Sequence, residues 1–245
     1  MLQQNNNQFT QSFKQDYGTH TLVQTFMARV FSWMFLALAV TAFTAYIFSG
    51  SPELMGLMIN AESGGMSILG WVVMLAPLGF VFFLGAKFQS LSRNSMVLIF
   101  IAFAVLMGMS MSFILLAYTA SSVFSTFVVT SGTFGVMAVL GYTTKTDLTK
   151  FGSILMMGLI GIILASIVNF FMQSSMMEYI ISILGVLIFT GLTAYDVQKI
   201  KRIGMATGDY EGQTTEKLAI MGALTLYLDF INLFLFLLRF MGNRR

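Results

Sequence analysis

The chain has 245 residues, of which 57% are hydrophobic and only 9% are charged, with a formal net charge of +3. A soluble globular domain carries roughly a quarter charged residues, so this chain cannot cover a water-facing surface and its outside must face lipid. The absence of cysteine excludes disulfides and thiolate sites, and the single histidine, His20, lies ahead of the first apolar run. Basic loops in a membrane protein chiefly set its orientation, so the positive charge does not indicate nucleic-acid binding.

The first 27 residues are polar and rich in glutamine and asparagine. They lack the basic start, apolar centre and small-residue cleavage site of a signal peptide. The sequence therefore predicts a short cytoplasmic tail over residues 1–27, followed by a single membrane domain over residues 28–245. The first span would act as its own insertion signal.

Seven apolar runs are long enough, at about 20 residues each, to cross a bilayer as helices. They cover residues 28–48, 67–86, 96–118, 121–142, 152–171, 178–198 and 217–240. The strands of a membrane barrel would be alternating segments of about 10 residues, a pattern that these unbroken runs do not follow. The sequence predicts an all-α, multi-pass membrane protein with seven transmembrane helices.

Basic residues alternate with acidic ones from one connection to the next. Lys and Arg lie at or near every second connection, at Lys14, Arg29, Lys87, Arg93, Lys145, Lys150, Lys199, Lys201, Arg202 and Lys217. The other connections carry Glu53, Glu62 and Glu178 instead. This pattern predicts a cytoplasmic N-terminus. Arg239, Arg244 and Arg245 break it if the last run spans fully; we expect a full span, and a re-entrant last segment is the alternative.

Two aspartates lie within apolar runs. Asp196 is near the cytoplasmic end of the sixth run, and Asp229 is about a dozen residues into the seventh. An aspartate at the centre of a membrane helix costs about 2.5–3.5 kcal/mol on insertion scales, and such residues face the bundle interior or a water-filled cavity. We interpret both as functional. The alternative is structural: Asp196 reaching the interface and Asp229 bonding to a neighbouring helix.

The polar neighbours of these aspartates share their helical faces. Thr225, Asp229 and Asn232 recur at helical spacing, and Thr193 precedes Asp196 by three residues. Adjacent antiparallel helices could thus direct the two carboxyl groups at each other. Two such carboxylates do not both ionise easily, so they would share a proton or hold a cation. The pair is therefore a candidate pH sensor and a candidate site for Ca²⁺, which prefers oxygen ligands.

Two further polar residues are expected to have structural roles. Asp147 precedes the fifth run and is expected to cap the start of that helix. Asn169, within the fifth run, is expected to hydrogen-bond to another helix.

Four sequence motifs resemble a known family. They are "TFMARVF" (25–31), "GYTTKTDL" (141–148), "TAYDVQKIK" (193–201) and "LYLDFINLF" (226–234). Together they resemble the Bax inhibitor family, the transmembrane BAX inhibitor motif proteins. The resemblance extends from the first span to the last, and the two motifs that contain aspartate are the most specific.

The resemblance implies seven helices with the last one central and wrapped by the other six. It also implies a pH-sensitive calcium leak channel of the bacterial cytoplasmic membrane, with Asp196 and Asp229 as a di-aspartyl sensor. A basic residue associated with the second helix serves the family as a latch, and Lys87 or Arg93 occupies that region here. The implied partners are the lipid bilayer and calcium ions, with no cofactor and no enzymatic activity.

The hypothesis that follows is a passive calcium leak. The carboxyl pair would hold the sixth and seventh spans together at their cytoplasmic ends, and a change in protonation would open a path lined by Asp229, Thr225 and Asn232. The direction of the pH response does not follow from the sequence. Neither do the physiological ion, the oligomeric state and the protein partners.

Two other functions compete with a channel. An intramembrane aspartyl protease of the presenilin type shares "YD" at Tyr195–Asp196, but its second motif reads Gly-x-Gly-Asp where this chain has "LYLD". A non-conducting regulator that binds a membrane protease or another membrane protein is the other alternative. Retinal binding would need a lysine deep in the last span, whereas Lys217 lies at its start, and a rhomboid-type protease would need an intramembrane histidine.

Overall fold

The computed structural model describes residues 2–60, 65–206 and 212–245, with side chains from Thr21 onward except at Gln213. The side chains of Lys14 and His20, and the whole of Glu62, lie outside the described residues. In the described parts of the chain there are eight α-helices, seven of them long and apolar enough to cross a membrane. They are α1 (Leu2–Gly50), α2 (Pro52–Met58), α3 (Ile68–Lys87), α4 (Arg93–Ala117), α5 (Ala120–Thr143), α6 (Thr149–Met172), α7 (Ser175–Ala206) and α8 (Gln213–Met241). The prediction of an all-α protein with seven spans is confirmed.

Hydroxyl side chains mark where several helices begin. Ser67, Ser92 and Thr119 accept hydrogen bonds from backbone N–H groups in the first turns of α3, α4 and α5. These caps satisfy donors that a helix leaves unpaired at its start. Asn169 closes the other end of α6, because its Oδ1 accepts from Ser174 N at 3.0 Å. The expected bond from Asn169 to another helix is therefore wrong: this side chain shapes the α6–α7 turn.

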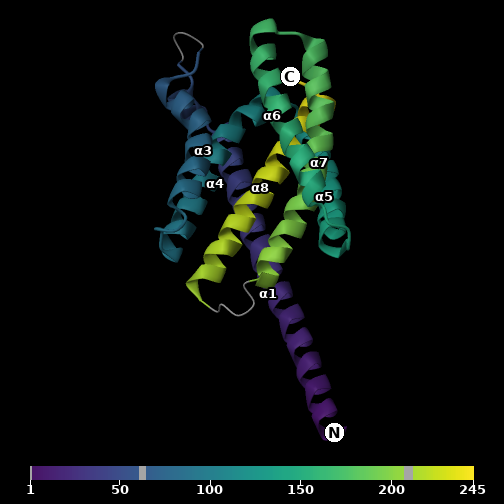
Figure 1. The fold of residues 1–245 in the computed structure, drawn as a ribbon. Coiled ribbons are helices and arrows are strands. Elements are labelled where there is room, and N and C mark those ends of the chain that lie inside the picture. Colours follow the sequence, from purple (N-terminus) through teal and green to yellow (C-terminus); the bar gives the residue numbers. More distant parts are fainter. Residues whose placement is uncertain (1, 61–64, 207–211) are drawn as a thin grey trace.

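The last helix is the most buried span. Within the bundle 61% of the α8 span is buried, compared with 6% of the α6 span. Helix α8 packs against α1, α4, α5 and α7, whereas α3 packs mainly on α4, and α6 on α7 (Figure 1). The central position of the last helix is confirmed, but its wrapping is supplied mainly by four of the other spans rather than by all six.

The core around α8 is aromatic. Tyr227 is fully buried and meets the edges of Phe100 and Phe103 from α4, with ring centroids 6.4 and 5.6 Å away. Its hydroxyl lies 2.7 Å from Thr41 Oγ1, which in turn donates to the Ala104 carbonyl at 3.0 Å. Since the threonine proton is used on Ala104, the tyrosine donates to the threonine. Helices α1, α4 and α8 are thus tied at mid-bundle.

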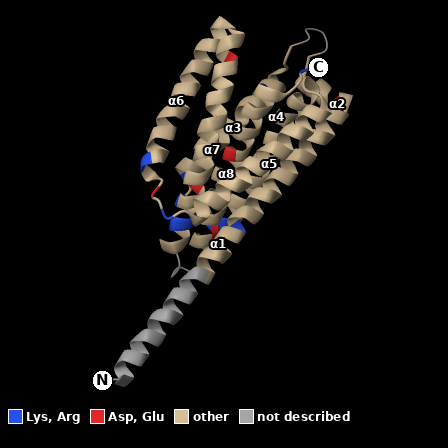
Figure 2. Cartoon of the chain, turned by 90° about the vertical axis from the view of Figure 1, so that its right-hand side faces the viewer, with Lys and Arg blue, Asp and Glu red and all other residues tan. Residues whose placement is uncertain are grey.

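Most charged residues lie toward the two ends of the bundle, and an acidic position lies near its middle (Figure 2). We call the end that carries the α3–α4, α5–α6 and α7–α8 connections the basic end, and the opposite one the far end. Helix α8 runs unbroken to Met241, and the following residues bond to the α4–α5 connection: Thr119 N donates to the Asn243 carbonyl, and Arg245 N to the Ala117 carbonyl. The last segment is therefore a full span, and the C-terminal residues lie at the far end.

Two of the three arginines that broke the charge pattern have an acidic partner there. Arg244 donates to Glu178 Oε1 at 2.7 Å, and Arg239 Nε lies 3.9 Å from the same oxygen. Arg244 also donates to the Tyr118 hydroxyl at 3.3 Å, and these contacts raise the pKa of its guanidinium. Glu178 thus offsets the positive charge of these arginines, which lie at the end where the alternation of Lys and Arg predicted no basic residues.

Candidate functional site

The two intramembrane aspartates meet between α7 and α8. Asp196 is 8% exposed and Asp229 is 5% exposed, although neither helix supplies a basic residue to pair with them in an ion pair. Their carboxyl groups lie close enough to interact directly with each other. The structure therefore brings together the two residues that carry the sequence hypothesis.

The surroundings of Asp196 explain its burial. In α7, residues 192–194 and 196–198 are all buried, so neighbours surround the helix at this level. On the α5 side, a side chain at Gly141 would collide with the Ala194 backbone, because the two helices touch there through their main chains. Such close approach requires glycine in a membrane helix pair. The carboxyl of Asp196 is left facing α8.

The electrostatic environment of the pair is sparse. The charged group that acts on Asp196, apart from Asp229, is Lys199, less than one turn further along α7. Its ammonium also lies 5.9 Å from the centroid of the Tyr195 ring. One oxygen, Asp229 Oδ2, is buried and has no hydrogen-bond partner among the described residues. Since an unpaired buried acceptor is unfavourable, this atom is the place where a proton, a water or a cation would bring the largest gain.

The three polar residues predicted to support the site bond within their own helices. Thr193 donates to the Phe189 carbonyl at 2.8 Å, Thr225 to that of Met221 at 3.1 Å, and Asn232 Nδ2 to that of Leu228 at 2.8 Å. None of these bonds uses a carboxylate of the pair. Their side-chain oxygens nevertheless keep lone pairs that a water or an ion can use.

The two candidate latch residues lie elsewhere. Arg93 forms an ion pair with Glu216 at the start of α8, and Lys87 is exposed at the end of α3. Among the described interactions, neither reaches the carboxyl pair. The positive charge that acts on Asp196 is that of Lys199, which belongs to α7 itself and forms no ion pair with Asp196 among the described residues.

The metal-binding capacity of the pair is limited. Within the described residues no cluster of three or more His, Cys, Asp or Glu is placed to hold a metal ion. Calcium takes six to eight oxygen ligands, so two carboxylates would need waters, hydroxyls or carbonyls to complete its shell.

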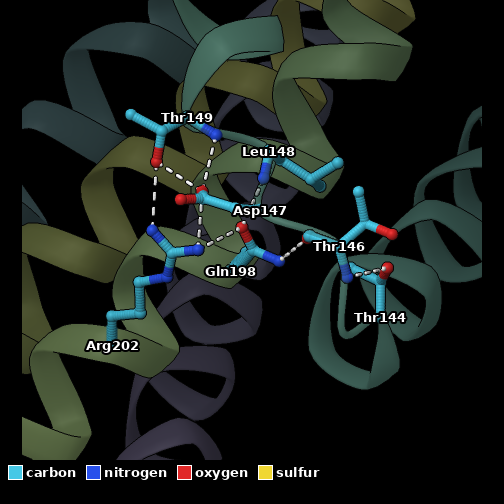
Figure 3. A network of polar contacts seen from close by, with 7 residues as sticks. All are labelled: Thr144, Thr146, Asp147, Leu148, Thr149, Gln198 and Arg202. Atoms are coloured by element: carbon cyan, nitrogen blue, oxygen red, sulfur yellow. Dashed lines mark hydrogen bonds and ion pairs between the residues drawn. The ribbon is translucent and has the colours of Figure 1, made fainter.

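A polar network at the basic end was not predicted as a unit (Figure 3). Asp147 accepts from Thr149 N at 2.9 Å, from its hydroxyl at 2.6 Å and from Arg202 at 2.7 Å. These contacts hold the pKa of Asp147 well below its usual value, with the threonine hydroxyl contributing most. The prediction that Asp147 is the N-cap of α6 is wrong: Leu148 is the N-cap residue and provides no side-chain cap, whereas Asp147, one residue earlier, bonds to Thr149 N at the start of the helix.

Gln198 joins this network to α7. Its amide oxygen accepts from Leu148 N at 2.9 Å, and its nitrogen donates to the Thr146 carbonyl at 2.8 Å. The buried amide lies two residues beyond Asp196, so the α5–α6 connection is fastened to α7 next to the carboxyl pair. A polar pair at i and i+4, Gln198 and Arg202, was the sequence signal that could have revealed it.

Comparison with known proteins adds an independent finding. The sequence pattern of a family described as "Inhibitor of apoptosis-promoting Bax1" matches residues 23–245. The chain is 45% identical to the inner membrane protein YbhL of Escherichia coli, over 91% of this chain and 93% of that one. It is also 36% identical to an uncharacterized membrane protein of Streptococcus pyogenes, over 89% and 92% of the two chains.

Proposed function

The chain belongs to the Bax inhibitor family, and on that basis we propose that it is a pH-sensitive calcium leak channel gated by Asp196 and Asp229. The observation that supports this proposal most directly is the contact of the two buried carboxyl groups between α7 and α8. No covalent step and no cofactor are part of the proposal. Calcium is the transported ion, which moves passively down its gradient.

A pair of facing carboxyl groups is suited to act as a switch. When they share one proton, a hydrogen bond joins α7 to α8; when both are ionised, their charges repel at short range in a medium that screens poorly. The change between these states alters the free energy of keeping the helices together. Lys199 adds a positive charge that moderates the repulsion on the Asp196 side.

Opening would expose oxygen atoms along α8. Separation of α7 and α8 at the basic end makes Asp229, Thr225 and Asn232 accessible from one face of α8, with Thr193 opposite on α7. Carboxylate, hydroxyl and amide oxygens are the donors that calcium prefers. The shortage of further acidic residues near the pair fits passage, because an ion must leave as readily as it enters.

The orientation in the proposal follows the charges. The basic end faces the cytoplasm, as does the start of the chain, in accordance with the excess of Lys and Arg at that end. One relative is named an inner membrane protein, which supports the cytoplasmic (inner) membrane of a bacterium as the location. In this orientation the pair responds to cytoplasmic pH.

The test is calcium entry into dye-loaded proteoliposomes between about pH 6 and 8. Wild type is compared with Asp196→Asn, Asp229→Asn and the double variant. The matched control is Glu53→Gln, which removes an exposed carboxylate in α2 at the far end. We expect a pH-dependent flux in wild type and in the control, and loss of the pH response in all three variants of the pair.

Two outcomes would contradict the proposal. Flux no greater than that of empty liposomes at every pH would exclude a calcium channel and favour a non-conducting regulator of a membrane protease or another membrane protein. A pH response that survives in both single variants would place the sensor outside the carboxyl pair.

A further inference from the structure

The buried face of α5 changes its chemistry halfway along the helix. Its buried residues recur every three or four positions, so they form one stripe; they are Ser122, Thr126, Thr130, Phe134, Ala138 and Gly141. Helix α5 packs against α7 and α8, and this stripe therefore faces those two helices. The half of the stripe toward the far end carries hydroxyl groups, and the half toward the basic end is apolar.

One of these hydroxyls has no partner. Thr126 is fully buried, and its Oγ1 has no hydrogen bond among the described residues. Thr130, also fully buried, instead donates to the Thr126 carbonyl at 2.7 Å, as membrane threonines commonly do. Buried polar atoms are nearly always bonded, and an exception calls for a water, an ion or a function.

The hydroxyl-bearing half of the stripe extends from the far end of the bundle to an aromatic contact. Ser122, its outermost member, accepts a hydrogen bond from Asn243 N at the far end. Toward mid-bundle it stops at Phe134, whose ring meets the edge of Phe230 with centroids 5.5 Å apart. Phe230 directly follows Asp229 in α8, and Phe134 lies eight residues after Thr126 in α5, so along the helices this aromatic contact lies between the levels of Thr126 and Asp229.

Helix α7 contributes a hydroxyl on the same side. Ser182 is almost fully buried, and it donates to the Glu178 carbonyl at 2.8 Å. It lies in the half of α7 toward the far end, between the Glu178 cluster and the Gly185–Phe236 contact. Hydroxyl groups on α5 and α7 therefore occupy the region between the carboxyl pair and the far surface.

We propose that Ser122, Thr126, Thr130 and Ser182 line the far half of the ion path, with Thr126 supplying a hydroxyl oxygen that has no hydrogen bond among the described residues. The path continues from Asp229 to the far surface, and the Phe134–Phe230 contact closes it in this structure. This inference rests on the proposed channel and names the half of the route that the α8 residues do not cover. Neutral hydroxyls hold a hydrated cation weakly, which permits passage.

The absence of native cysteine allows a direct test. Thr126→Cys is nearly isosteric, and its control, Val129→Cys, lies three residues further on the lipid-facing side of the same helix. Thiols react as thiolates in water, so a small cationic methanethiosulfonate should modify Thr126→Cys at least about tenfold faster than Val129→Cys. Equal rates at every pH between about 6 and 8, with the protein in liposomes, would overturn the proposal.

A flux measurement separates this inference from the channel itself. Thr126→Val keeps the volume but removes the hydroxyl, and we expect calcium flux to fall about three- to tenfold, while Thr126→Ser retains it. Thr143→Val, at an exposed position of α5, is the control and should not change the flux. Wild-type flux that Thr126→Val leaves intact would overturn the route and leave the channel. No flux, together with rapid labelling of Thr126→Cys, would support a water-filled route while excluding calcium as its ion.

Discussion

Helices α7 and α8 contact each other along most of their lengths. One region of this interface is held by ion pairs between unlike charges, and another brings two like-charged groups together. At the far end, Glu178 pairs with Arg244 and Arg239, and the ring of Phe236 stacks on Phe189 with centroids 5.7 Å apart. Near mid-bundle, the two carboxyl groups of Asp196 and Asp229 face each other. Attraction between unlike charges varies little near neutral pH, whereas the interaction of two carboxyls changes sign with one proton. From this difference we expect the far end to act as a fixed pivot and the basic end to be the part that moves.

Cross-linking α7 to α8 would test this difference between the two parts of the interface most directly. A Cβ at Gly222 of α8 would lie 3.2 Å from Ile200 Cγ2 of α7, close to the spacing of a disulfide, so Ile200→Cys with Gly222→Cys can bridge the basic end. We expect the oxidised pair to reduce calcium flux at least about tenfold and a reducing agent to restore it, because a disulfide prevents the helices from separating. Fluorescence of the calcium dye in liposomes measures both states.

The matched control bridges the pivot instead. Gly185 and Phe236 touch, so Gly185→Cys with Phe236→Cys places a disulfide at the far half of the same interface. Its oxidation should leave the flux and its pH response unchanged. Inhibition by both disulfides, or by neither, would contradict the division into a pivot and a moving end.

A second variant examines how firmly α8 itself is held. Tyr227→Phe removes the hydroxyl that donates to Thr41, and Thr41 keeps its bond to the Ala104 carbonyl. We expect the free energy of unfolding to fall by about 0.5–1.5 kcal/mol, measured by denaturation in detergent, with the pH response of flux retained. Tyr179→Phe, at an exposed position of α7, is the control and should change stability little.

The contribution of the far-end charges should be smaller. Glu178→Gln removes the carboxylate shared by Arg244 and Arg239, and these side chains are largely exposed. Exposed ion pairs contribute roughly 0–1 kcal/mol, and we expect a loss of stability in the lower half of that range. The salt dependence of the thermal midpoint should also weaken in this variant. A loss of the pH response of flux would show that the far end takes part in gating.

Asp147 should have no effect on gating at neutral pH. Its pKa in the folded protein lies below the ordinary value of 3.8, so the stability that its ionised form supplies is complete above that value and is lost as the pH falls through the lower one. Between about pH 6 and 8 the group does not titrate. Asp147→Asn should therefore leave the pH response of calcium flux unchanged, although it removes the acceptor of Arg202. A shifted response would show that the network in Figure 3 is part of the sensor.

The sequence predicts the spans well because hydropathy and length alone determine what can cross a bilayer. Asp196 and Asp229 were likewise predictable, since an aspartate in an apolar run is conspicuous and helical spacing gives its direction. Other features depend on which helix lies beside which. Gln198 and Thr126 look ordinary in the sequence. Only the packing of α5 and α6 against α7 places Gln198 in a hydrogen-bond network and leaves Thr126 Oγ1 without a hydrogen-bond partner among the described residues.

The positions of the two candidate latch residues, Lys87 and Arg93, have the same explanation. Lys87 and Arg93 are near the start of α4 along the chain, but the distance from there to Asp196 depends on the packing of α3 and α4 at the edge of the bundle. Helix α3 contacts mainly α4, so the residues at its end are not directed at the centre. The C-terminal arginines show the reverse case: counting Lys and Arg alone missed that Glu178 is placed to meet them.

Only 6% of the α6 span is buried inside the bundle, and the helix packs chiefly against α7. If α7 swings at the basic end, α6 and the α5–α6 connection fastened by Gln198 must swing with it and displace lipid on the way. The open protein would then occupy a larger cross-section in one leaflet than in the other. Its gating equilibrium would respond to lateral pressure and to the shape of the surrounding lipids, and a bilayer that is tightly packed in that leaflet would favour the closed form at the same pH.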